Sequence, residues 1–394
     1  MSASGPRVAR MQAPAPVLGR RALNRALLAR QHLLARHEAS VLDEVTHLVG
    51  LQAQAPWSPY TALWSRLAPF SPTELGDLLV GREVARVAAM RSTVHLLTAD
   101  DALLLPVLTA AVGERGVRGK GPFSDTLHAL DLAELAAAGR EILEAEPMTP
   151  ARLGERLRER WPQGAPEALA HGVRYLLALV QTPPRAVWGR SGATVWTTTR
   201  AWLGREPEDL DDPETHDAAL RQVVLRYLAA FGPASTADVQ RWIGLTRLAP
   251  VLEGLRGELV AFRAESGPSG RPGRELFDLP DAPRPAPETP APVRFLPDFD
   301  NVLLSHADRG RIVSEDDRQA FARANGLTPG SVLVDGFVAA AWSLRRDRAT
   351  ATLEVQLLRP LARAERDEMA AEAEALARFL AEDADAHDVA IVNA

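Results

Sequence analysis

Gln52 and Gln54 are the residues of this sequence whose types and spacing best suit chemistry. They lie in the segment Gly50-Leu-Gln-Ala-Gln-Ala-Pro-Trp. Gly50 can end a helix, and Pro56 keeps Ala55 out of the helical region, so we predict an extended segment between them. Residues two apart in such a segment point the same way, and the two amides would face one space. Paired amides can orient a water molecule or read base edges; alternatively, they satisfy backbone groups at a helix end.

A second set of polar residues lies on a predicted strand pair over residues 84–97. Arg91, Thr93 and His95 alternate along it and would share one side of a strand. This side faces either the glutamine pair and a nucleic acid, or solvent as an ordinary polar strand face. Tryptophans are a third set, and Trp57, Trp64, Trp188 and Trp242 serve either as core residues or as base-stacking platforms.

The common catalytic and binding motifs are absent from the sequence. There is no His-Glu-x-x-His, no Walker loop, no Gly-x-Ser-x-Gly and no dinucleotide fingerprint. The nine histidines are scattered, so we expect no metal site and no cofactor. The Gly267–Gly273 loop is expected to be a mobile wing or connector, although its arginines could touch a phosphate backbone.

Composition narrows the class of protein. The 394 residues exceed the roughly 250–300 that one core can hold, and they indicate two or three domains. With 24% charged and 46% hydrophobic residues, the chain is not a disordered one. The absence of cysteine excludes disulfides, thiolate zinc sites and cysteine nucleophiles. No apolar run approaches the roughly 18 residues of a membrane span, so we expect a soluble, multi-domain, intracellular protein without a membrane partner.

Charge is distributed unevenly along the chain. The formal net charge is −6, so no overall positive field favours a nucleic acid. However, the first forty residues hold seven arginines and one acid, Glu38. The last predicted helix, over residues 363–382, is rich in acids. The basic end is therefore the better place for a polyanion.

The order of predicted elements repeats three times. Helices are expected at 20–39, 40–49, from Tyr60 and from Ser71, then at 132–145, 149–160 and 167–181, then at 218–230, 235–243 and 247–255. Each group precedes a strand pair, at 84–97, within 186–197, and at 259–263 with 275–279. Three helices followed by a hairpin is the winged-helix layout. Further strands are expected at 293–296, 302–305, 332–334, 337–343 and 350–358, with a two-residue hairpin at Val334-Asp-Gly-Phe.

These patterns predict an α+β chain of six segments. They are a disordered tail (1–16), a first winged helix that carries the glutamine pair (17–120), a second (125–205), a third (213–280), a Pro-rich linker (281–292) and a C-terminal β domain with an acidic helix (293–394).

Five segments also match a known pattern in order, over roughly residues 18–355. They are Leu23-Asn-Arg-Ala-Leu-Leu-Ala-Arg-Gln-His-Leu-Leu, Val49-Gly-Leu-Gln-Ala-Gln-Ala-Pro, Met90-Arg-Ser-Thr-Val-His-Leu-Leu, Phe231-Gly-Pro-Ala-Ser-Thr-Ala-Asp-Val with Trp242-Ile-Gly, and Phe295-Leu-Pro-Asp-Phe-Asp-Asn-Val-Leu-Leu-Ser-His-Ala-Asp-Arg. Together they resemble the AlkZ-like DNA glycosylases, relatives of YcaQ.

The resemblance implies tandem winged helices in a C-shaped body, closed by a C-terminal β-barrel-like domain and gripping duplex DNA. It implies that Gln52 and Gln54 are the catalytic Gln-apolar-Gln pair of a monofunctional DNA glycosylase. The family hydrolyses N-glycosidic bonds of alkylated purines, and some members unhook interstrand crosslinks. We therefore expect double-stranded DNA with alkylated bases as the partner of a monomer that acts in alkylation repair.

The resemblance also implies a set of DNA contacts. Arginines of the first helix, Arg20 and Arg25, would hold phosphates, and Arg91, Thr93 and His95 would face the DNA. Asp300, Asn301, His306 and Arg309 flank a segment similar to the family's DNA-probing hairpin; alternatively, the aspartates are turn residues. A rival reading is a non-catalytic winged-helix DNA-binding protein or regulator, and a third is a divergent protein that binds no DNA.

Overall fold

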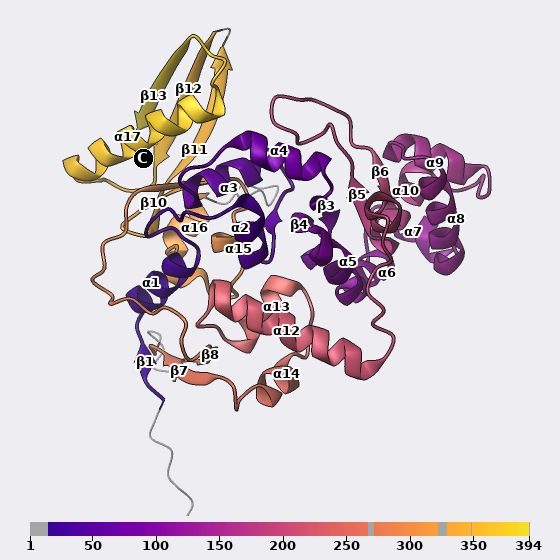
Figure 1. The fold of residues 1–394 in the computed structure, drawn as a ribbon, viewed down its shortest axis with the longest axis horizontal. Coiled ribbons are helices and arrows are strands. Elements are labelled where there is room, and N and C mark those ends of the chain that lie inside the picture. The colour runs from indigo at the N-terminus through magenta and orange to yellow at the C-terminus, as the bar shows by residue number, and fades with distance from the viewer. Residues whose placement is uncertain (1–14, 267–271, 322–328, 348, 394) are drawn as a thin grey trace, which may run out of the picture.

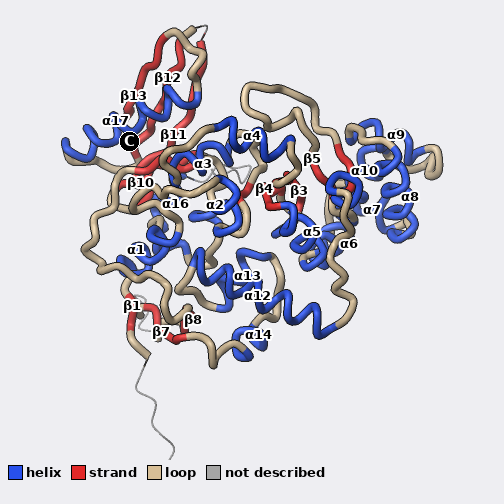
Figure 2. The backbone as a smooth tube through the Cα atoms, in the orientation of Figure 1, coloured by secondary structure: helices blue, strands red, loops and turns tan. Residues whose placement is uncertain are grey.

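The structure is a computed structural model that describes residues 15–266, 272–321, 329–347 and 349–393. Within these ranges it has a mixed α and β fold with three sheets, as Figures 1 and 2 show. The predicted tail, apart from its last two residues, and most of the Gly267–Gly273 loop lie outside the described residues. Among the helices of the described part, none combines the length and apolarity needed to cross a membrane.

The first helices pack around the segment that carries the glutamine pair. They are α1 (Arg20–Arg30), α2 (Val41–His47), α3 (Ser58–Arg66) and α4 (Pro72–Val80). The predicted helix over 20–39 is wrong beyond Arg30. His32 adopts a left-handed φ of 52°, and the Leu33 N–H donates to the Leu28 carbonyl at 2.9 Å. This pairing closes a helix in the manner of a Schellman turn, so the chain leaves α1 there.

The central sheet joins strands from the first two predicted winged helices. Its order is β2-β4-β3-β5-β6. The strands are β2 (Leu51–Gln52), β3 (Val84–Ala88), β4 (Val94–Thr98), β5 (Leu179–Gln181) and β6 (Trp196–Thr198). β3 pairs antiparallel with both β4 and β5, and Val87 lies opposite Val180. The predicted hairpin at 84–97 thus shares a sheet with β6, at the end of the second predicted strand pair, and with β5, which forms where the sequence predicts the end of the helix at 167–181.

The predicted strand at residues 186–188 is wrong. Ala186 has a φ of 66°, which a strand does not allow, and Val187 and Trp188 pack instead against the core beneath α3 and α4. Helices α5 (Ala99–Leu108), α6 (Ala110–Arg118) and α7 (Ser124–His128) precede the second helical group, and α11 (Thr199–Leu203) follows it.

The second helical group consists of α8 (Leu132–Ala145), α9 (Pro150–Arg158) and α10 (Pro166–Leu176). Proline at the first position of α9, after the capping side chain of Thr149, is the arrangement that the sequence predicts. The third group is α12 (Pro213–Phe231), α13 (Thr236–Ile243) and α14 (Ala249–Gly254), followed by β7 (Val260–Ala264) and β8 (Glu275–Asp278). β1 (Val17–Leu18) pairs in parallel with β7, so the start of the described chain lies against this third group.

The C-terminal part is an open sheet, which corrects the expectation of a barrel. Its order is β13-β12-β11-β10-β9, and β9 and β13 do not pair with each other. The strands are β9 (Arg294–Leu296), β10 (Gly330–Val334), β11 (Phe337–Asp347), β12 (Thr350–Leu357) and β13 (Ala386–Val392). Helix α17 (Arg363–Leu380) buries Met369 and Leu376 in the sheet core, so a helix rather than further strands covers the apolar face (Figure 1).

Local signals in this part are confirmed in one place and wrong in another. The hairpin at Val334-Asp-Gly-Phe forms, with φ of 50° at Asp335 and 81° at Gly336. The predicted strand over 302–305 is instead the short helix α15 (Asn301–Leu304), because the side chain of Asp300 caps it by accepting from the Val302 N–H. The short helices η2 (Arg309–Arg311) and α16 (Glu315–Phe321) follow.

The largest core cluster holds these parts together. It contains Leu27 of α1, Val87 of β3, Phe231 of α12 and Leu303 of α15, with Met90 at the tip of the β3–β4 hairpin. The hairpin beside the glutamine pair is therefore packed against residues from all along the chain.

Candidate active site

The start of the glutamine segment is extended, as the sequence predicts, whereas the chain bends at Gln54. Leu51 and Gln52 form β2, which pairs antiparallel with β4 and places Gln52 opposite His95. The Ala53 N–H continues the pairing by donating to the Val94 carbonyl at 2.8 Å. Gly50 enters the segment with φ of 89°, where an added Cβ would lie 2.9 Å from the Leu96 carbonyl oxygen. Only glycine therefore suits this entry to β2.

Ala53 faces the core, and this orients its two neighbours. Ala53 is fully buried among apolar residues beneath α3. In an extended chain the side chains on either side of it leave in the opposite direction. Gln52 is 7% exposed, whereas Gln54 is exposed. Gln54 therefore reaches solvent, whereas Gln52 is buried and hydrogen-bonded.

Both side-chain oxygens of the pair are held by the β3–β4 hairpin. Oε1 of Gln52 accepts a hydrogen bond from Arg91 at 2.8 Å, and Oε1 of Gln54 accepts one from the Val94 N–H at 3.4 Å. Among the described residues, no protein acceptor meets the Nε2 group of either glutamine. The free ends of both amides are therefore N–H donors.

Arg91 is the residue whose side chain bonds directly to the side chain of Gln52. It lies in the short helix η1 (Met90–Ser92), not in a strand as expected, and it has a left-handed φ of 56°. Its guanidinium also donates to the Trp242 carbonyl and lies 3.5 Å from Nε2 of His95. Burial and the nearby charges of Arg241 and Arg309 lower the pKa of Arg91 to about 10, so the group still carries its charge near neutral pH.

His95 is neutral in this site. It is 1% exposed, and its Nδ1 donates to the Thr93 carbonyl at 2.9 Å. Burial, and secondarily the charge of Arg91, lower its pKa to about 3. The Thr93 hydroxyl donates to the Met90 carbonyl, so Thr93 stabilises the hairpin tip and does not meet the glutamines. The expectation that Arg91, Thr93 and His95 share one strand face is wrong, since only His95 lies in β4.

Arg86 is a residue that sequence reasoning missed. It lies on β3, is 1% exposed and donates to the Ala53 carbonyl at 2.8 Å. Its Nε and Nη1 atoms are buried without a hydrogen-bond partner. Burial and then the charge of Arg185 lower its pKa to about 10. An arginine inside the apolar run Val84-Ala-Arg-Val-Ala was the available signal, because a buried arginine needs a specific partner.

Asn301 braces the glutamine segment from a distant part of the chain. Its Nδ2 donates to the Gly50 carbonyl at 2.8 Å, and its Oδ1 accepts from the Gln52 N–H at 3.3 Å. The residue is 4% exposed. Sequence reasoning placed Asn301 among DNA contacts, whereas its side chain orders the backbone on which Gln52 stands.

Three further predicted DNA contacts are buried in structural interactions. Asp300 forms an ion pair of 2.9 Å with Arg66, and both side chains are fully buried. His306 is 1% exposed, and its Nε2 donates to the Phe231 carbonyl at 3.0 Å. Arg25 is fully buried and bonds to Asp335 and to the Thr289 carbonyl. These three side chains are not on a surface that DNA reaches.

Two of the predicted DNA contacts, Arg309 and Arg20, keep some access to solvent. Arg309 is partly buried, and its pKa is lowered by burial and by the charges of Arg241 and Arg318. Arg91, Arg241 and Arg309 thus share one positive region next to Gln52. Arg20 is exposed on α1, with its guanidinium 4.7 Å from the centre of the Phe337 ring. N–H donors of this kind hold phosphate oxygens.

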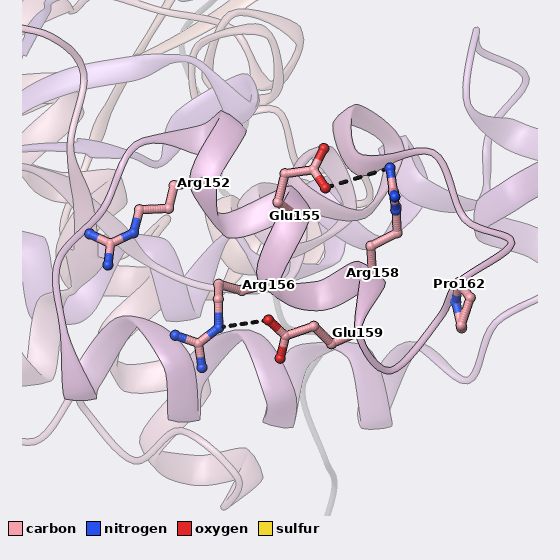
Figure 3. Close-up of a pocket in the computed structure, with 6 residues that line it drawn as sticks. All are labelled: Arg152, Glu155, Arg156, Arg158, Glu159 and Pro162. Carbon is pink, nitrogen blue, oxygen red and sulfur yellow. Dashed lines mark ion pairs between the residues drawn. The ribbon is translucent and has the colours of Figure 1, made fainter.

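A hollow of the surface on α9 lacks the net positive charge that surrounds Gln52. Figure 3 shows that it is lined by arginines and glutamates of α9 and of the residues just after it. Arg156 pairs with Glu159 at 3.4 Å, and Arg158 pairs with Glu155 at 3.5 Å. Because these charges offset each other, the hollow offers little attraction to a polyanion. Among the described residues, no group of three His, Asp or Glu side chains is arranged to hold a metal ion.

Comparison with known proteins gives consistent matches. The sequence model of a family described as AlkZ-like, DNA glycosylase AlkZ-like, matches residues 45–379. The chain is similar to an interstrand DNA cross-link repair glycosylase from Streptomyces sahachiroi, with 28% identity over 342 residues, 80% of this chain and 85% of that protein. The structure is similar to that of the Streptomyces sahachiroi DNA glycosylase AlkZ, with a TM-score of 0.74 and 22% identity. This likeness covers 95% of this chain and 100% of that one and shows a shared fold.

Proposed function

The chain belongs to the AlkZ-like family of DNA glycosylases, and we propose that it hydrolyses the N-glycosidic bond of purines alkylated at N7 or N3, with Gln52 and Gln54 positioning the water. The observation that carries this proposal is the anchoring of both amide oxygens on one hairpin, beside a positive surface. The charged groups that shift the pKa of Arg91 and of His95 are all arginines, so the charge around the pair is positive.

Neutral amides suit a substrate that is already activated. A purine alkylated at N7 or N3 carries a positive charge, so it leaves the sugar without being protonated by the enzyme. The protein then needs only to place a water beneath the oxocarbenium-like sugar. Each amide oxygen has two lone pairs, so those engaged by Arg91 and Val94 can still accept a hydrogen bond from the water, while the Nε2 groups donate. The bond to the sugar breaks with its electron pair on the purine, which leaves neutral, and the proton lost when water adds to the sugar passes to solvent. An amide is a poor base, and unmodified nucleotides should survive.

The positive region next to Gln52 binds the phosphate backbone of the DNA and not the damaged base. Arg91, Arg241 and Arg309 offer donors to phosphates near the lesion. The bound phosphates then offset the positive field where the cationic purine lies. We also propose that bulky adducts and interstrand crosslinks are substrates, because a similar protein is named an interstrand DNA cross-link repair glycosylase.

The direct test is release of free 7-methylguanine from a duplex that contains one N7-methylguanine. We expect wild-type protein to release the base, and Gln52→Ala and Gln54→Ala each to slow release by about 100-fold, within the range of a lost catalytic group. Both variants should bind the duplex as wild type does. Gln222→Ala, which removes an exposed amide on α12, is the matched control and should keep the full rate.

The rival function predicts a different result. If wild-type protein binds the duplex but releases no base from N7-methylguanine, from N3-methyladenine or from a crosslinked guanine, the chain acts as a non-catalytic DNA-binding protein. A duplex affinity that is weak and independent of salt would contradict DNA binding itself, since phosphate contacts impose a steep salt dependence.

A further inference from the structure

The side chain of Arg86 reaches the glutamine segment from inside the core. Val84, two positions before Arg86 on β3, packs with Ala53 in the cluster beneath α3. Ala85 and Val87 pack in the largest core cluster instead. Because side chains alternate along a strand, Arg86 points to the same side as Val84. β4 lies between β3 and the glutamine segment, so the side chain of Arg86 passes beneath β4 to meet the Ala53 carbonyl.

The hydrogen bond from Arg86 falls on the peptide group that links Ala53 to Gln54. Nη2 of Arg86 donates to the Ala53 carbonyl at 2.8 Å, and the Ala53 N–H donates to the Val94 carbonyl at 2.8 Å. Both backbone polar groups of Ala53 are therefore held. The Ala53 carbonyl and the Gln54 N–H share one planar peptide group. The direction of this carbonyl thus sets how the chain enters the bend at Gln54.

Arg86 differs from the other deeply buried arginines in having no counter-charge. The four most buried arginines of the described residues are Arg25, Arg30, Arg66 and Arg86. Each of the first three forms an ion pair with an aspartate. Within the described part of the chain, Arg86 pairs with no acid, and its Nε and Nη1 are buried without a hydrogen-bond partner. The charged group that acts on it most is another cation, Arg185.

This environment makes Arg86 unfavourable for stability. A buried charge without a counter-charge costs free energy, and each unpartnered N–H has lost its hydrogen bond to water. An apolar side chain of similar volume would fill the same space without these costs. A residue that weakens the fold at a functional segment is expected where activity, and not stability, requires it.

We infer that Arg86 is a positioning residue, which holds the peptide group between Ala53 and Gln54 and so fixes the placement of the Gln54 amide relative to Gln52. Hydrogen bonds from charged donors are stronger than neutral ones, which suits a bend next to β2, at the edge of its sheet. Arg86 is 1% exposed, so it acts on the reaction only through this peptide group. The inference rests on the proposed function, because it assigns a support to the glutamine pair.

Substitution by methionine tests the inference, because Arg86→Met removes the donors and keeps most of the side-chain volume. We expect kcat on N7-methylguanine to fall by about tenfold, since a hydrogen bond from a charged group is lost. KM and duplex affinity should stay within about twofold, because Arg86 does not reach the DNA. The urea midpoint of unfolding should be unchanged or higher. Arg86→Lys keeps a charged donor and should recover part of the lost rate.

The matched control is Val84→Ala, which shortens a fully buried side chain on the same face of β3. It leaves a cavity, so it should lower the urea midpoint, while kcat should stay within about twofold. If Arg86→Met lowers the midpoint as Val84→Ala does, Arg86 is an ordinary core residue and the inference is overturned. An unchanged kcat in Arg86→Met, or a higher KM without a loss of kcat, overturns it as well.

Failure of the proposed function is recognised separately. If wild-type protein releases no 7-methylguanine, the glycosylase proposal fails for this substrate, and amide hydrogen exchange then decides on Arg86. Exchange over residues 50–55 should be about tenfold faster in Arg86→Met than in wild type, although the urea midpoint is not lower. Equal exchange of this segment in the two proteins would show that Arg86 does not order it and would overturn the inference.

Discussion

The guanidinium of Arg91 donates a hydrogen bond of 2.8 Å to the side-chain oxygen of Gln52. Arginine has only donors, so the contact fixes which end of the amide is oxygen and turns Nε2 away from Arg91. Arg91 reaches Gln52 from a left-handed backbone, and Ser92 follows with φ of 57°. Such conformations cost energy in residues other than glycine and persist only where surrounding contacts hold them.

The first prediction concerns the coupling of Arg91 and Gln52. Arg91→Met should lower kcat on N7-methylguanine by about tenfold or more, because hydrogen bonds to charged groups are worth about 1.5–3 kcal/mol. In a Gln52→Ala background the same substitution should cost much less, since its partner is already gone. Single-turnover rates of wild type, the two single variants and the double variant measure the coupling. Fully additive effects would show that Arg91 does not act through Gln52.

The second prediction concerns the pH dependence of the rate. The pKa of His95 is lowered to about 3, and the glutamines do not titrate, so no group of the described site changes charge near neutral pH. We expect kcat on N7-methylguanine to vary less than about twofold between pH 5.5 and 8.0. An acidic limb in that range, measured by single turnover, would indicate a general base outside the glutamine pair.

The third prediction concerns the pH dependence of stability. The pKa of His95 falls from 6.5 in the unfolded chain to about 3 in the fold, because burial disfavours the charged ring. The unfolded state therefore binds more protons below pH 6.5, and stability is full above that pH and is lost as pH falls toward 3. Each pH unit costs up to about 1.4 kcal/mol per histidine. Burial lowers the pKa of His306 in the same direction.

Urea unfolding between pH 7 and 4.5 measures this loss. The free energy of unfolding of wild type should fall by about 2 kcal/mol or more. His95→Gln should flatten the slope by about one proton, because glutamine stays neutral. An unchanged slope in this variant would show that His95 is not the group that titrates on unfolding.

The fourth prediction concerns the buried ion pair of Arg66 and Asp300. Asp300→Asn leaves a fully buried guanidinium without its counter-charge and should destabilise the fold by about 3–5 kcal/mol. Asp367→Asn breaks an exposed pair of 3.8 Å on α17 and should change stability by less than about 0.5 kcal/mol. Urea midpoints measure both. Equal, small effects would mean that Asp300 is a surface residue, as the sequence prediction held.

The fifth prediction separates exposed arginines near the proposed DNA surface from an exposed arginine elsewhere. Arg20→Ala and Arg241→Ala each remove an exposed cation and should reduce the slope of log K against log salt by about one. Arg363→Ala, which removes a 96% exposed cation on the acidic helix α17, is the control and should leave the slope unchanged. Anisotropy titrations over a range of salt concentrations test this prediction. Unchanged slopes in the first two variants would place the DNA elsewhere.

Several features of the fold follow from local chemistry and could be read along the chain. Gly50 and Pro56 exclude a helix between them, which leaves Leu51 and Gln52 free to form β2. Asp335-Gly336 adopts the positive φ values that its hairpin needs. Short-range rules failed where a cap or a left-handed residue intervened: His32 ended α1 early, and Asp300 turned a predicted strand into α15.

The sequence by itself determined the residue types of the site, the α+β class and the resemblance that led to the family. Only the tertiary structure decided what surrounds Gln52. Asn301 reaches Gly50 and Gln52 across 249 or more positions of chain, and Arg91 arrives from the tip of a hairpin. Packing also decided that the C-terminal strands form an open sheet and not the expected barrel. It left Trp57, three residues after Gln54, exposed. Backbone preferences act over a few residues, whereas these contacts depend on how distant apolar faces pack, which no local pattern specifies.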